Sequence, residues 1–596
     1  MLVIGIYDDH NSSAALSIDG SIVCAVQEER FTKRKNEKGF PKNAVSYILN
    51  KYKLNNTNID VVAMSTIQRA DINNTKYPID AVFGISDYID MMEDYWKPKL
   101  AGKPYPKYYA KEIFEKKFNG EECFYNIPDS FYDLGENELQ EKMISRITDD
   151  VAAFIGVNKE KIKFYDHHTC HVMYGYYANP NRQDKTIGII VDAYGDNRNQ
   201  TVWKIEGDKF ELISDSAECD IARLYRMVTL YLRMKPLEHE FKVMGMAPYA
   251  KDKYSNEVVK VFDGLSKFDG LRIVRDTRPD NLYEFLNEEL KYFRFDNISA
   301  GVQKYTENML IKLFSKAASE LNIKNFVFSG GVAMNVKANK ALGDLDCVED
   351  LYVAGSGSDE SQSIGACYFA NHENEIKNQP LKDLYLGTEN SEQEVSEYIE
   401  QNNLNEEYKI TKVQNKEIAK LLADGEVVAR VVGKMEFGSR ALGNRSILAD
   451  PSNPSIIQHI NELIKGRDFW MPFAATILDR FEERYLVNHK GFESRYMAVA
   501  MDSKKEFLQD IKAGTHPYDE TVRPQILTRD QNENYYDLIE EFSNLTGIGA
   551  LLNTSYNLHG LPVVNDVADA IHVFQNSGLK YLILNETLIS KKSTDT

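Results

Sequence analysis

The stretch "MLVIGIYDDHNSSAALSIDGSIVCAVQEERF", residues 1–31, decides the fold prediction. An apolar run ends at Asp8 and Asp9, a second run meets an Asp-Gly turn, and a third run follows, which predicts three strands. Residues 185–214, "KTIGIIVDAYGDNRNQTVWKIEGDKFELIS", repeat this plan, with a first strand that ends at Asp192. Two copies of one supersecondary unit predict a duplicated domain.

Two such units facing each other across a nucleotide cleft define the actin-like (ASKHA, RNase H-like) architecture. We therefore predict an actin-like α/β domain over residues 1–375; the alternative is a coincidence between two ordinary hairpins. In "NFVFSGGVAMNVKANKAL", residues 325–342, a buried strand runs into Gly330 and Gly331 and then into a helix near Asn335. This arrangement lets a backbone approach a nucleotide, although many such turns serve packing alone.

A change in composition predicts a second domain. Residues 372–410 are polar, charged and poor in large aliphatic side chains, which is typical of a domain boundary. We assign residues 384–596 to an α/β C-terminal domain that opens with the helix "KEIAKLLADG" and the strand "EVVARVVG".

The net charge and the cysteine content exclude some classes of function and favour one cellular compartment. The chain has 596 residues and a formal net charge of −19, which argues against general binding to nucleic acid or to an anionic membrane surface. Its six cysteines are scattered without a CxxC pair, so we expect reduced thiols in a cytoplasmic protein. The N-terminal segment turns acidic after six residues, and no apolar run reaches the length of a membrane span, so neither a signal peptide nor a membrane span is expected.

Histidines are concentrated in "FYDHHTCHVMYGYY", residues 164–177, although the chain holds only 11 in total. His167 and His171 are four residues apart, so a helix would place both on one face, within reach of one ion. The alternative is a helix whose histidines pack beside tyrosines. Asp192 and Asp359 follow predicted strands and favour the metal reading. Two imidazoles and two carboxylates suit Fe(II), Mn(II) or Zn(II), and open positions favour iron.

The C-terminal domain holds a cationic constellation in an acidic chain. Arginine forks match phosphate oxygens, and the intervening glycines let backbone N–H groups come close, so the pattern predicts a phosphate-binding pocket rather than a solvated helix face. Short polar side chains in "NTSYNLHGLPVV", residues 553–564, form a turn that caps a helix or holds a ligand. The basic side chains singled out are Lys434, Arg440, Arg445, Lys465, Arg467 and Arg523, with Asn444 and Ser446 between them and His516 nearby.

These stretches together resemble the NodU/CmcH-type O-carbamoyltransferases, which decorate nodulation factors, aminoglycosides, cephalosporins and other natural products. The resemblance runs in order from residue 5 to about residue 570. The segments that support it are "HNSSAAL", "HHTCH", "VDAYGD", "EFKVMGMAPYA", "SGGVAMN", "KMEFGSRALGNRSILADP", "RDFWMPFAA", "TVRPQ" and "NTSYNLHGLPVV".

The resemblance implies two steps in two domains. Carbamoyl phosphate and ATP, the latter with Mg(II), give carbamoyl-adenylate in a YrdC-like, adenylate-forming C-terminal domain. The carbamoyl group then passes to a hydroxyl of a small molecule at an Fe(II) site, or a site for another divalent metal, in the N-terminal domain.

The family motifs also imply individual roles. The metal ligands are His167, His171, Asp192 and Asp359. His10 is the acid/base near the acceptor, and Asp296 corresponds to a family aspartate in the same cleft. Nucleotide contacts of the N-terminal domain fall to Gly330, Gly331 and Asn335. Carbamoyl phosphate and ATP are assigned to Lys434, Arg440, Asn444, Arg445, Arg467, Arg523, Asn553, Ser555 and Asn557.

Other readings stay open at this point. An actin-like small-molecule kinase would use the same N-terminal cleft and release ADP, leaving the C-terminal cations without a role. A non-catalytic nucleotide-binding scaffold would bind ATP and turn over nothing. A metalloprotease is disfavoured because the glutamate of HExxH is absent. The acceptor, the metal, the role of Cys170 and of the Tyr-rich residues 77–109, and the oligomeric state, for which a homodimer is one candidate, are not given by the sequence.

Overall fold

The computed structural model describes residues 1–118 and 120–592 of the chain. These residues separate into two compact units, Met1–Leu381 and Lys382–Thr596. The division falls in the interval between the two predicted domains. In the described part of the chain, no helix combines the length and the apolar character needed to cross a bilayer.

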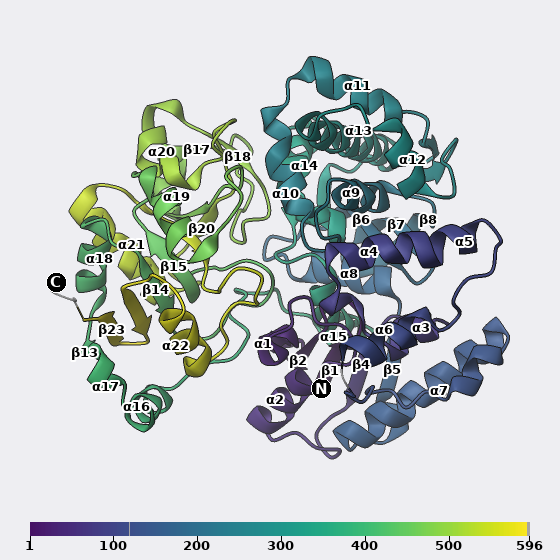
Figure 1. Ribbon diagram of the computed structural model, residues 1–596, viewed down its shortest axis with the longest axis horizontal. Helices are drawn as coiled ribbons and strands as arrows, with labels where there is room; N and C mark the ends of the chain where they lie inside the picture. The colour runs from purple at the N-terminus through teal and green to yellow at the C-terminus, as the bar shows by residue number, and fades with distance from the viewer. Residues whose placement is uncertain (119, 593–596) are drawn as a thin grey trace. The chain divides into compact units, whose positions relative to one another are not determined.

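The N-terminal unit contains two five-stranded mixed sheets with the same strand order (Figure 1). In each sheet the first three strands of the repeat pair antiparallel, and two later strands add on parallel to the first. The predicted repeat is therefore present as a duplicated unit. The first sheet comprises β3 (Ser21–Gln27), β2 (Ser13–Ile18), β1 (Leu2–Tyr7), β4 (Val61–Ser65) and β5 (Ile162–Tyr165). The second comprises β8 (Lys209–Ser216), β7 (Arg198–Glu206), β6 (Lys185–Gly195), β11 (Asn325–Ser329) and β12 (Asp350–Val353).

Two helices lie between these sheets. Helix α15 (Gln362–Glu373) packs on β1, and α8 (His167–Tyr177) packs on β6 and against α15. A Cβ at Gly5 in β1 would overlap the backbone of α15, and a Cβ at Gly188 in β6 would overlap Val172 of α8. The glycine thus sits at the same place in both "IGI" strands and admits one helix to each sheet. Helix α15 passes so close to α8 that a Cβ at Gly365 would overlap the backbone of Cys170. This close packing leaves the Cys170 side chain fully buried.

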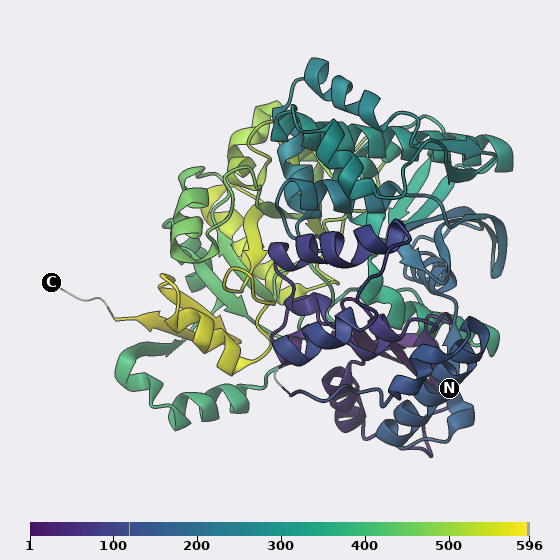
Figure 2. The ribbon, with the colours of Figure 1, turned by 45° about the vertical axis from the view of Figure 1, so that its right-hand side comes forward.

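Insertions within the repeats form further helices. The Tyr-rich segment folds into short helices around an apolar cluster that also includes Leu230 and Tyr283 of the second repeat. Its helix α4 (Ile85–Asp90) contacts α9 (Ile221–Tyr231) (Figure 2). A short hairpin, β9 (Ser266–Asp269) with β10 (Arg272–Arg275), lies beside β8. The remaining helices and helical turns of this unit are α1 (Glu29–Thr32), α2 (Lys42–Tyr52), α3 (Ile72–Lys76), η1 (Asp80–Val82), α4 (Ile85–Asp90), η2 (Met91–Trp96), α5 (Lys97–Leu100), α6 (Tyr109–Lys117), η3 (Asp129–Asp133), α7 (Glu136–Ile155), η4 (Lys159–Lys161), α9 (Ile221–Tyr231), α10 (Glu240–Met246), η5 (Ala247–Tyr249), α11 (Asp252–Phe262), α12 (Leu282–Glu289), α13 (Phe295–Leu321), η6 (Gly331–Met334), α14 (Val336–Gly343) and η7 (Asp359–Ser361).

The C-terminal unit is built on an eight-stranded mixed sheet with helices packed against it. In order across the sheet, its strands are β13 (Tyr408–Lys412), β23 (Thr587–Lys591), β22 (Tyr581–Leu584), β14 (Val428–Val431), β15 (Arg445–Ala449), β21 (Ala550–Ser555), β16 (Ala474–Leu478) and β20 (Gln525–Leu527). A three-stranded sheet of β17 (Leu486–Val487), β18 (Met501–Ser503) and β19 (Thr521–Val522) is separate from it. Its helices and helical turns are α16 (Glu392–Gln401), α17 (Leu404–Glu407), α18 (Asn415–Ala423), α19 (Ser455–Ile460), η8 (Asn461–Lys465), η9 (Asp479–Phe481), α20 (Glu482–Tyr485), η10 (Lys505–Gly514), α21 (Glu533–Thr546) and α22 (Val567–Gln575).

The predicted opening of this unit was wrong by three elements. Helix α16, the short helix α17 and the edge strand β13 precede the helix "KEIAKLLADG". Their sequence is polar because α16 buries only Val395 and Ile399, and because β13 pairs with a single neighbour and stays largely exposed. Segments of this kind have the composition of a linker although they are folded.

Candidate functional site

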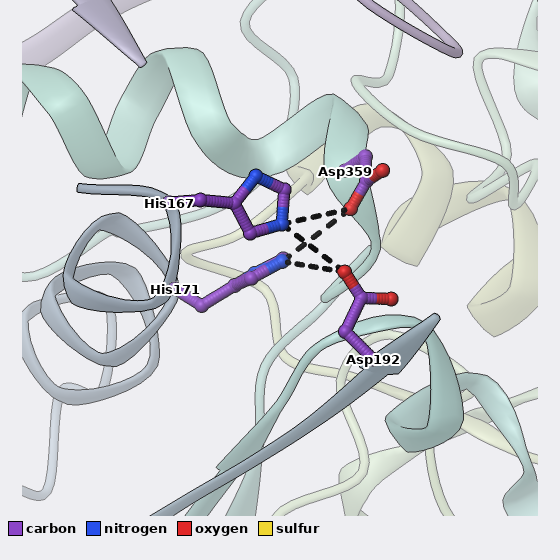
Figure 3. A group of neighbouring side chains, drawn as sticks. All are labelled: His167, His171, Asp192 and Asp359. Atoms are coloured by element: carbon purple, nitrogen blue, oxygen red, sulfur yellow. Dashed lines mark hydrogen bonds and ion pairs between the residues drawn. The ribbon is translucent and has the colours of Figure 1, made fainter. Parts of the chain in front are cut away.

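Four side chains of the N-terminal unit converge at the ends of its central elements (Figure 3). His167 and His171 come from the first turns of α8, Asp192 lies near the end of β6, and Asp359 begins η7 before α15. One ligand atom from each residue lies within 4.8 Å of all the others. His167 Nε2 is 3.1 Å from Asp192 Oδ2 and 3.6 Å from Asp359 Oδ1. His171 Nε2 is 3.6 Å from Asp192 and 3.4 Å from Asp359.

These distances fit a divalent metal ion better than direct hydrogen bonding. Metal bonds of about 2.0–2.2 Å place neighbouring ligand atoms roughly 3–3.6 Å apart. His171 Nε2 and Asp359 Oδ1 are buried, and neither has a hydrogen-bond partner among the described residues. Buried polar atoms without partners are costly, so two of them aimed at one point suit a shared ion.

The charges in the cluster are strongly coupled. Burial by itself lowers the pKa of His167, but the hydrogen bond to Asp192 and the charges of Asp359 and Asp192 raise it to about 9. Burial opposes ionisation of Asp192, yet the two histidines hold its pKa well below the usual value. His168, the neighbouring residue, is buried against Thr201, and burial followed by the charges of His167 and His171 lowers its pKa. An incoming cation therefore meets Asp192 already ionised and must displace a proton from His167.

A surrounding shell fixes the four side chains. The Tyr7 hydroxyl donates to Asp359 Oδ2 at 2.8 Å, and the Gly331 N–H donates to Asp192 Oδ1 at 3.1 Å. Asp196 accepts from the N–H of His167 at 2.6 Å. Such outer contacts orient metal ligands and tune them. Tyr7, Asp196 and Thr66, which lies 3.4 Å from His167 Nδ1, were not singled out from sequence, because nothing in their spacing ties them to α8.

Gly195 lets the His167 ring lie flat against the end of β6. A Cβ at this position would overlap the imidazole carbons. We expect Gly195→Ala to push His167 aside and to weaken metal affinity about 10–100-fold, the range seen for outer-shell changes. Gly135→Ala is the matched control, since nothing lies within 4 Å of its added methyl. Titration of each metal-loaded variant with a chelator measures its metal affinity. Equal metal affinities in Gly195→Ala and Gly135→Ala would contradict the packing role of Gly195.

The other predicted residues of the N-terminal unit lie in different settings. His10 follows β1, three residues beyond Tyr7, and is half-buried. Asp296 lies in the first turn of α13, where both of its oxygens accept from Arg294 at 3.0 and 3.1 Å. These contacts do not reach the group of His167, His171, Asp192 and Asp359 (the metal-type cluster). Gly330, with φ +94°, packs against the backbone of β6, and Asn335 caps α14 and bonds with Gln303.

In the C-terminal unit, three predicted arginines form a cationic cluster. Arg440 comes from the loop between β14 and β15, Arg467 follows η8, and Arg523 precedes β20. Burial and then the charge of Arg440 lower the pKa of Arg467 to about 10. Burial, Arg440 and Arg467 hold the pKa of Arg523 well below its ordinary value. The buried Arg523 Nε has no hydrogen-bond partner in the part of the chain that the structure describes.

Lys465 and the turn after β21 lie beside this cluster. The Lys465 ammonium donates to Asn557 Oδ1 at 2.6 Å and to Ser555 Oγ at 3.3 Å. Arg467 donates to Thr554 Oγ1 at 2.9 Å, so the same turn links both cations. Mutual repulsion among these crowded, partly buried cations costs stability unless an anion offsets it, which makes this a candidate phosphate site.

The remaining predicted residues hold the structure of this unit. Arg445 is fully buried, and its guanidinium donates to main-chain carbonyls that include Val432, Gly433 and Thr388 at 3.1–3.4 Å. Asn444 donates to the carbonyl of Lys434, whose own side chain is exposed. Asn553 donates to the carbonyl of Ala441 and to Thr476 Oγ1, both at 3.1 Å.

Glu436 organises the loop that carries Arg440, a role that sequence reasoning missed. Its Oε1 accepts from the N–H groups of Leu442, Asn444 and Arg445 at 2.6–3.3 Å. The signal in the sequence is a lone acid inside the cationic run "KMEFGSRALGNR". A carboxylate oxygen that accepts from three backbone N–H groups fixes the loop in one conformation.

Comparison with known families shows what class of protein carries these two sites. Residues 2–368 match the family model described as carbamoyltransferase N-terminus, and residues 419–591 match the one described as carbamoyltransferase C-terminus. The two matches define a group-transfer enzyme. The chain belongs to the carbamoyltransferase family.

Two relatives with similar sequences match nearly the whole chain, and a third matches about half of it. An uncharacterized protein of Methanocaldococcus jannaschii is 29% identical over 99% of this chain and 100% of its own length. Nodulation protein NolNO of Sinorhizobium fredii is 26% identical over 98% of this chain and 79% of its own. Nodulation protein U of Bradyrhizobium diazoefficiens is 29% identical over 51% of this chain and 52% of its own length. Among solved structures, component A of the (R)-2-hydroxyglutaryl-CoA dehydratase of Acidaminococcus fermentans covers 63% of this chain and 100% of its own, with 13% identity and a TM-score of 0.32.

Proposed function

We propose that this carbamoyltransferase is an ATP-dependent O-carbamoyltransferase with two separate active sites. The C-terminal unit forms carbamoyl-adenylate from carbamoyl phosphate and Mg-ATP, and the N-terminal unit transfers the carbamoyl group to a hydroxyl of a small molecule. The observation that carries the proposal is the presence, in different units of one carbamoyltransferase chain, of a four-ligand metal-type cluster and a triad of neighbouring, partly buried arginines. We further propose an actin-like fold for the N-terminal unit and a YrdC-like fold for the C-terminal one.

The first step needs cationic side chains and does not use the four residues of the metal-type cluster. Water releases phosphate from carbamoyl phosphate, and an oxygen of the resulting carbamate attacks the α-phosphorus of ATP, releasing pyrophosphate. Both reagents are strongly anionic, so Arg440, Arg467 and Arg523 bind their phosphate oxygens with charge-assisted hydrogen bonds. Lys465, held by Ser555 and Asn557, adds a further cation at the turn after β21.

The second step takes place at the N-terminal cluster. The acceptor oxygen attacks the carbamoyl carbon, AMP leaves, and the hydroxyl proton passes to a base. His10 follows β1 at the end that carries Tyr7, which bonds to Asp359, and imidazole moves protons near neutral pH. A divalent ion, Fe(II) by its mixed N/O ligand set, would be held by His167, His171, Asp192 and Asp359 and would supply Lewis-acid chemistry.

Product analysis tests the proposal against the kinase and scaffold alternatives. With carbamoyl phosphate present, the protein should convert ATP to AMP and pyrophosphate, and omission of carbamoyl phosphate should stop this conversion. ADP as the product would support a kinase, and binding of ATP without turnover would support a scaffold. Either result would overturn the two-site mechanism.

A further inference from the structure

A second group of arginines lies in the N-terminal unit, outside the sites described above. Arg223 and Arg226 lie on α9, Arg275 ends β10, and Arg278 lies in the loop that follows. Three of them meet one carboxylate, Asp220, which is buried just before α9. Arg275 Nε and Arg278 Nε are each 2.7 Å from Asp220 Oδ2, and Arg223 Nη1 is 3.2 Å from Oδ1.

This group places four guanidinium groups around one directly paired carboxylate. Among the residues that the structure describes, Asp220 is the carboxylate at ion-pair distance from them, and Glu218, Asp280 and Glu240 act on the group from farther away. Burial, and then repulsion from Arg226 and Arg275, lowers the pKa of Arg223 in spite of Asp220. Arg226 Nε is buried without a hydrogen-bond partner in the described chain. A group of arginines that served only to tie α9 to β10 would need no fourth member with an unpaired donor.

The group lies beside the metal-type cluster. Helix α9 packs on β6 and η6, the two elements that carry Asp192 and Gly331. Arg223 lies over the ring of Tyr194, 5.3 Å from its centroid, and Tyr194 is two residues beyond Asp192. Tyr194 is half exposed at this point, which leaves the Arg223 side of the loop open to a ligand.

We propose that Arg223, Arg226, Arg275 and Arg278 bind an anionic group of the acceptor, so that the acceptor is a hydroxyl compound that also carries a phosphate or carboxylate. This inference rests on the proposed function and names its substrate class. Guanidinium forks suit oxyanions, and the C-terminal arginines already provide for the phosphates of ATP and carbamoyl phosphate. Four arginines also exceed what the single phosphate of an adenylate requires.

Binding of three probes to the full chain tests the proposal. Glycerol 3-phosphate represents the anionic acceptor, glycerol is its neutral parent, and AMP represents the adenylate. We expect the wild type to bind glycerol 3-phosphate at least about 10-fold more tightly than glycerol by calorimetry, the value of one charge-assisted contact. Arg223→Gln with Arg226→Gln should weaken glycerol 3-phosphate binding about 100-fold and leave AMP binding unchanged.

The controls separate a binding role from a structural one. Arg226 makes no recorded hydrogen bond through Nε, and Arg275 and Arg278 keep Asp220 paired in the double variant. The double variant Arg223→Lys with Arg226→Lys should bind glycerol 3-phosphate with an affinity between those of the wild type and the glutamine variant. Lysine keeps the positive charge but loses the forked pair of donors. Arg272→Gln, on the same hairpin but 48% exposed and facing Asp269, should bind like the wild type.

Two outcomes would overturn the inference. Unchanged glycerol 3-phosphate binding in the glutamine variant would assign these arginines to structure, and loss of AMP binding instead would assign them to the adenylate. Pyrophosphate release dependent on carbamoyl phosphate should persist in the variant. If wild type itself lacks that release, the two-site mechanism fails separately from the acceptor assignment.

Discussion

A protein with His167 and His171 both changed to alanine should lose its bound transition metal and its ability to transfer the carbamoyl group. The two imidazoles supply half of the four-ligand set, and the remaining carboxylates, Asp192 and Asp359, lack the nitrogen ligands that favour iron over magnesium or calcium. Loss of Lewis-acid stabilisation worth about 4 kcal/mol corresponds to roughly a 1,000-fold lower transfer rate. Metal analysis of protein purified without oxygen measures the first effect, with about one ion per wild-type chain expected.

The same variant should still make carbamoyl-adenylate. The first step is assigned to the C-terminal unit, whereas the two substituted histidines belong to the N-terminal unit, so pyrophosphate release should persist while the adenylate hydrolyses in water. His168→Asn is the matched control, because His168 lies on the same helix and bonds to Thr201 instead of joining the ligand set. Full metal retention in the His167, His171 double variant would contradict the metal site, and loss of pyrophosphate release would contradict the separation of the two steps.

The duplicated fold was predictable because its signal is local. The strand, acidic loop and hairpin each occupy a few residues, and period-2 patterns with Asp-Gly or Gly-Asp turns mark them twice in the chain. The helical spacing of His167 and His171 likewise needed no long-range information. The two aspartates could be added because strand ends of a duplicated domain meet at one cleft.

The contacts that distinguish one cation from another were not predictable. Arg445 and Arg523 occupy similar polar motifs, yet one lies in a strand and donates to main-chain carbonyls while the other joins a cluster of like charges. The arginine group around Asp220 joins α9 to a hairpin more than forty residues further along the chain, so no motif spacing could reveal it. Such features depend on tertiary pairing, which single-sequence patterns do not contain.

Replacing Arg523 by methionine should strongly weaken formation of the adenylate and yet stabilise the protein. Arg523 is held against Arg440 and Arg467, and its lowered pKa means that the folded state disfavours the charged form that exists at neutral pH. Sites that trade stability for binding gain roughly 0.5–2 kcal/mol when the strained group is removed. For a unit of this size, that corresponds to an unfolding temperature about 2–4 °C higher per kcal/mol.

Binding should change in the opposite direction. Each lost charge-assisted bond to a phosphate costs on the order of 1.5–3 kcal/mol, or about 10–100-fold in carbamoyl phosphate affinity. Carbamoyl phosphate should therefore raise the unfolding temperature of the wild type and have little effect on Arg523→Met. Arg484→Gln is the control for activity, because Arg484 pairs with Asp510 on the surface of the same unit and should leave pyrophosphate release intact.

Arg445 and Arg523 both have a lowered pKa, but their replacement should change stability in opposite directions. Burial lowers the pKa of Arg445 to about 10 as well, so a change in pKa alone does not separate the two arginines. Arg445 satisfies several buried carbonyls, and Arg445→Met should leave them unpaired at a cost of at least about 2–3 kcal/mol. The unfolding temperature should thus rise for Arg523→Met and fall for Arg445→Met. If both variants unfold at a lower temperature, and Arg523→Met keeps its carbamoyl phosphate affinity, the arginine triad is a structural element and the first step must take place elsewhere.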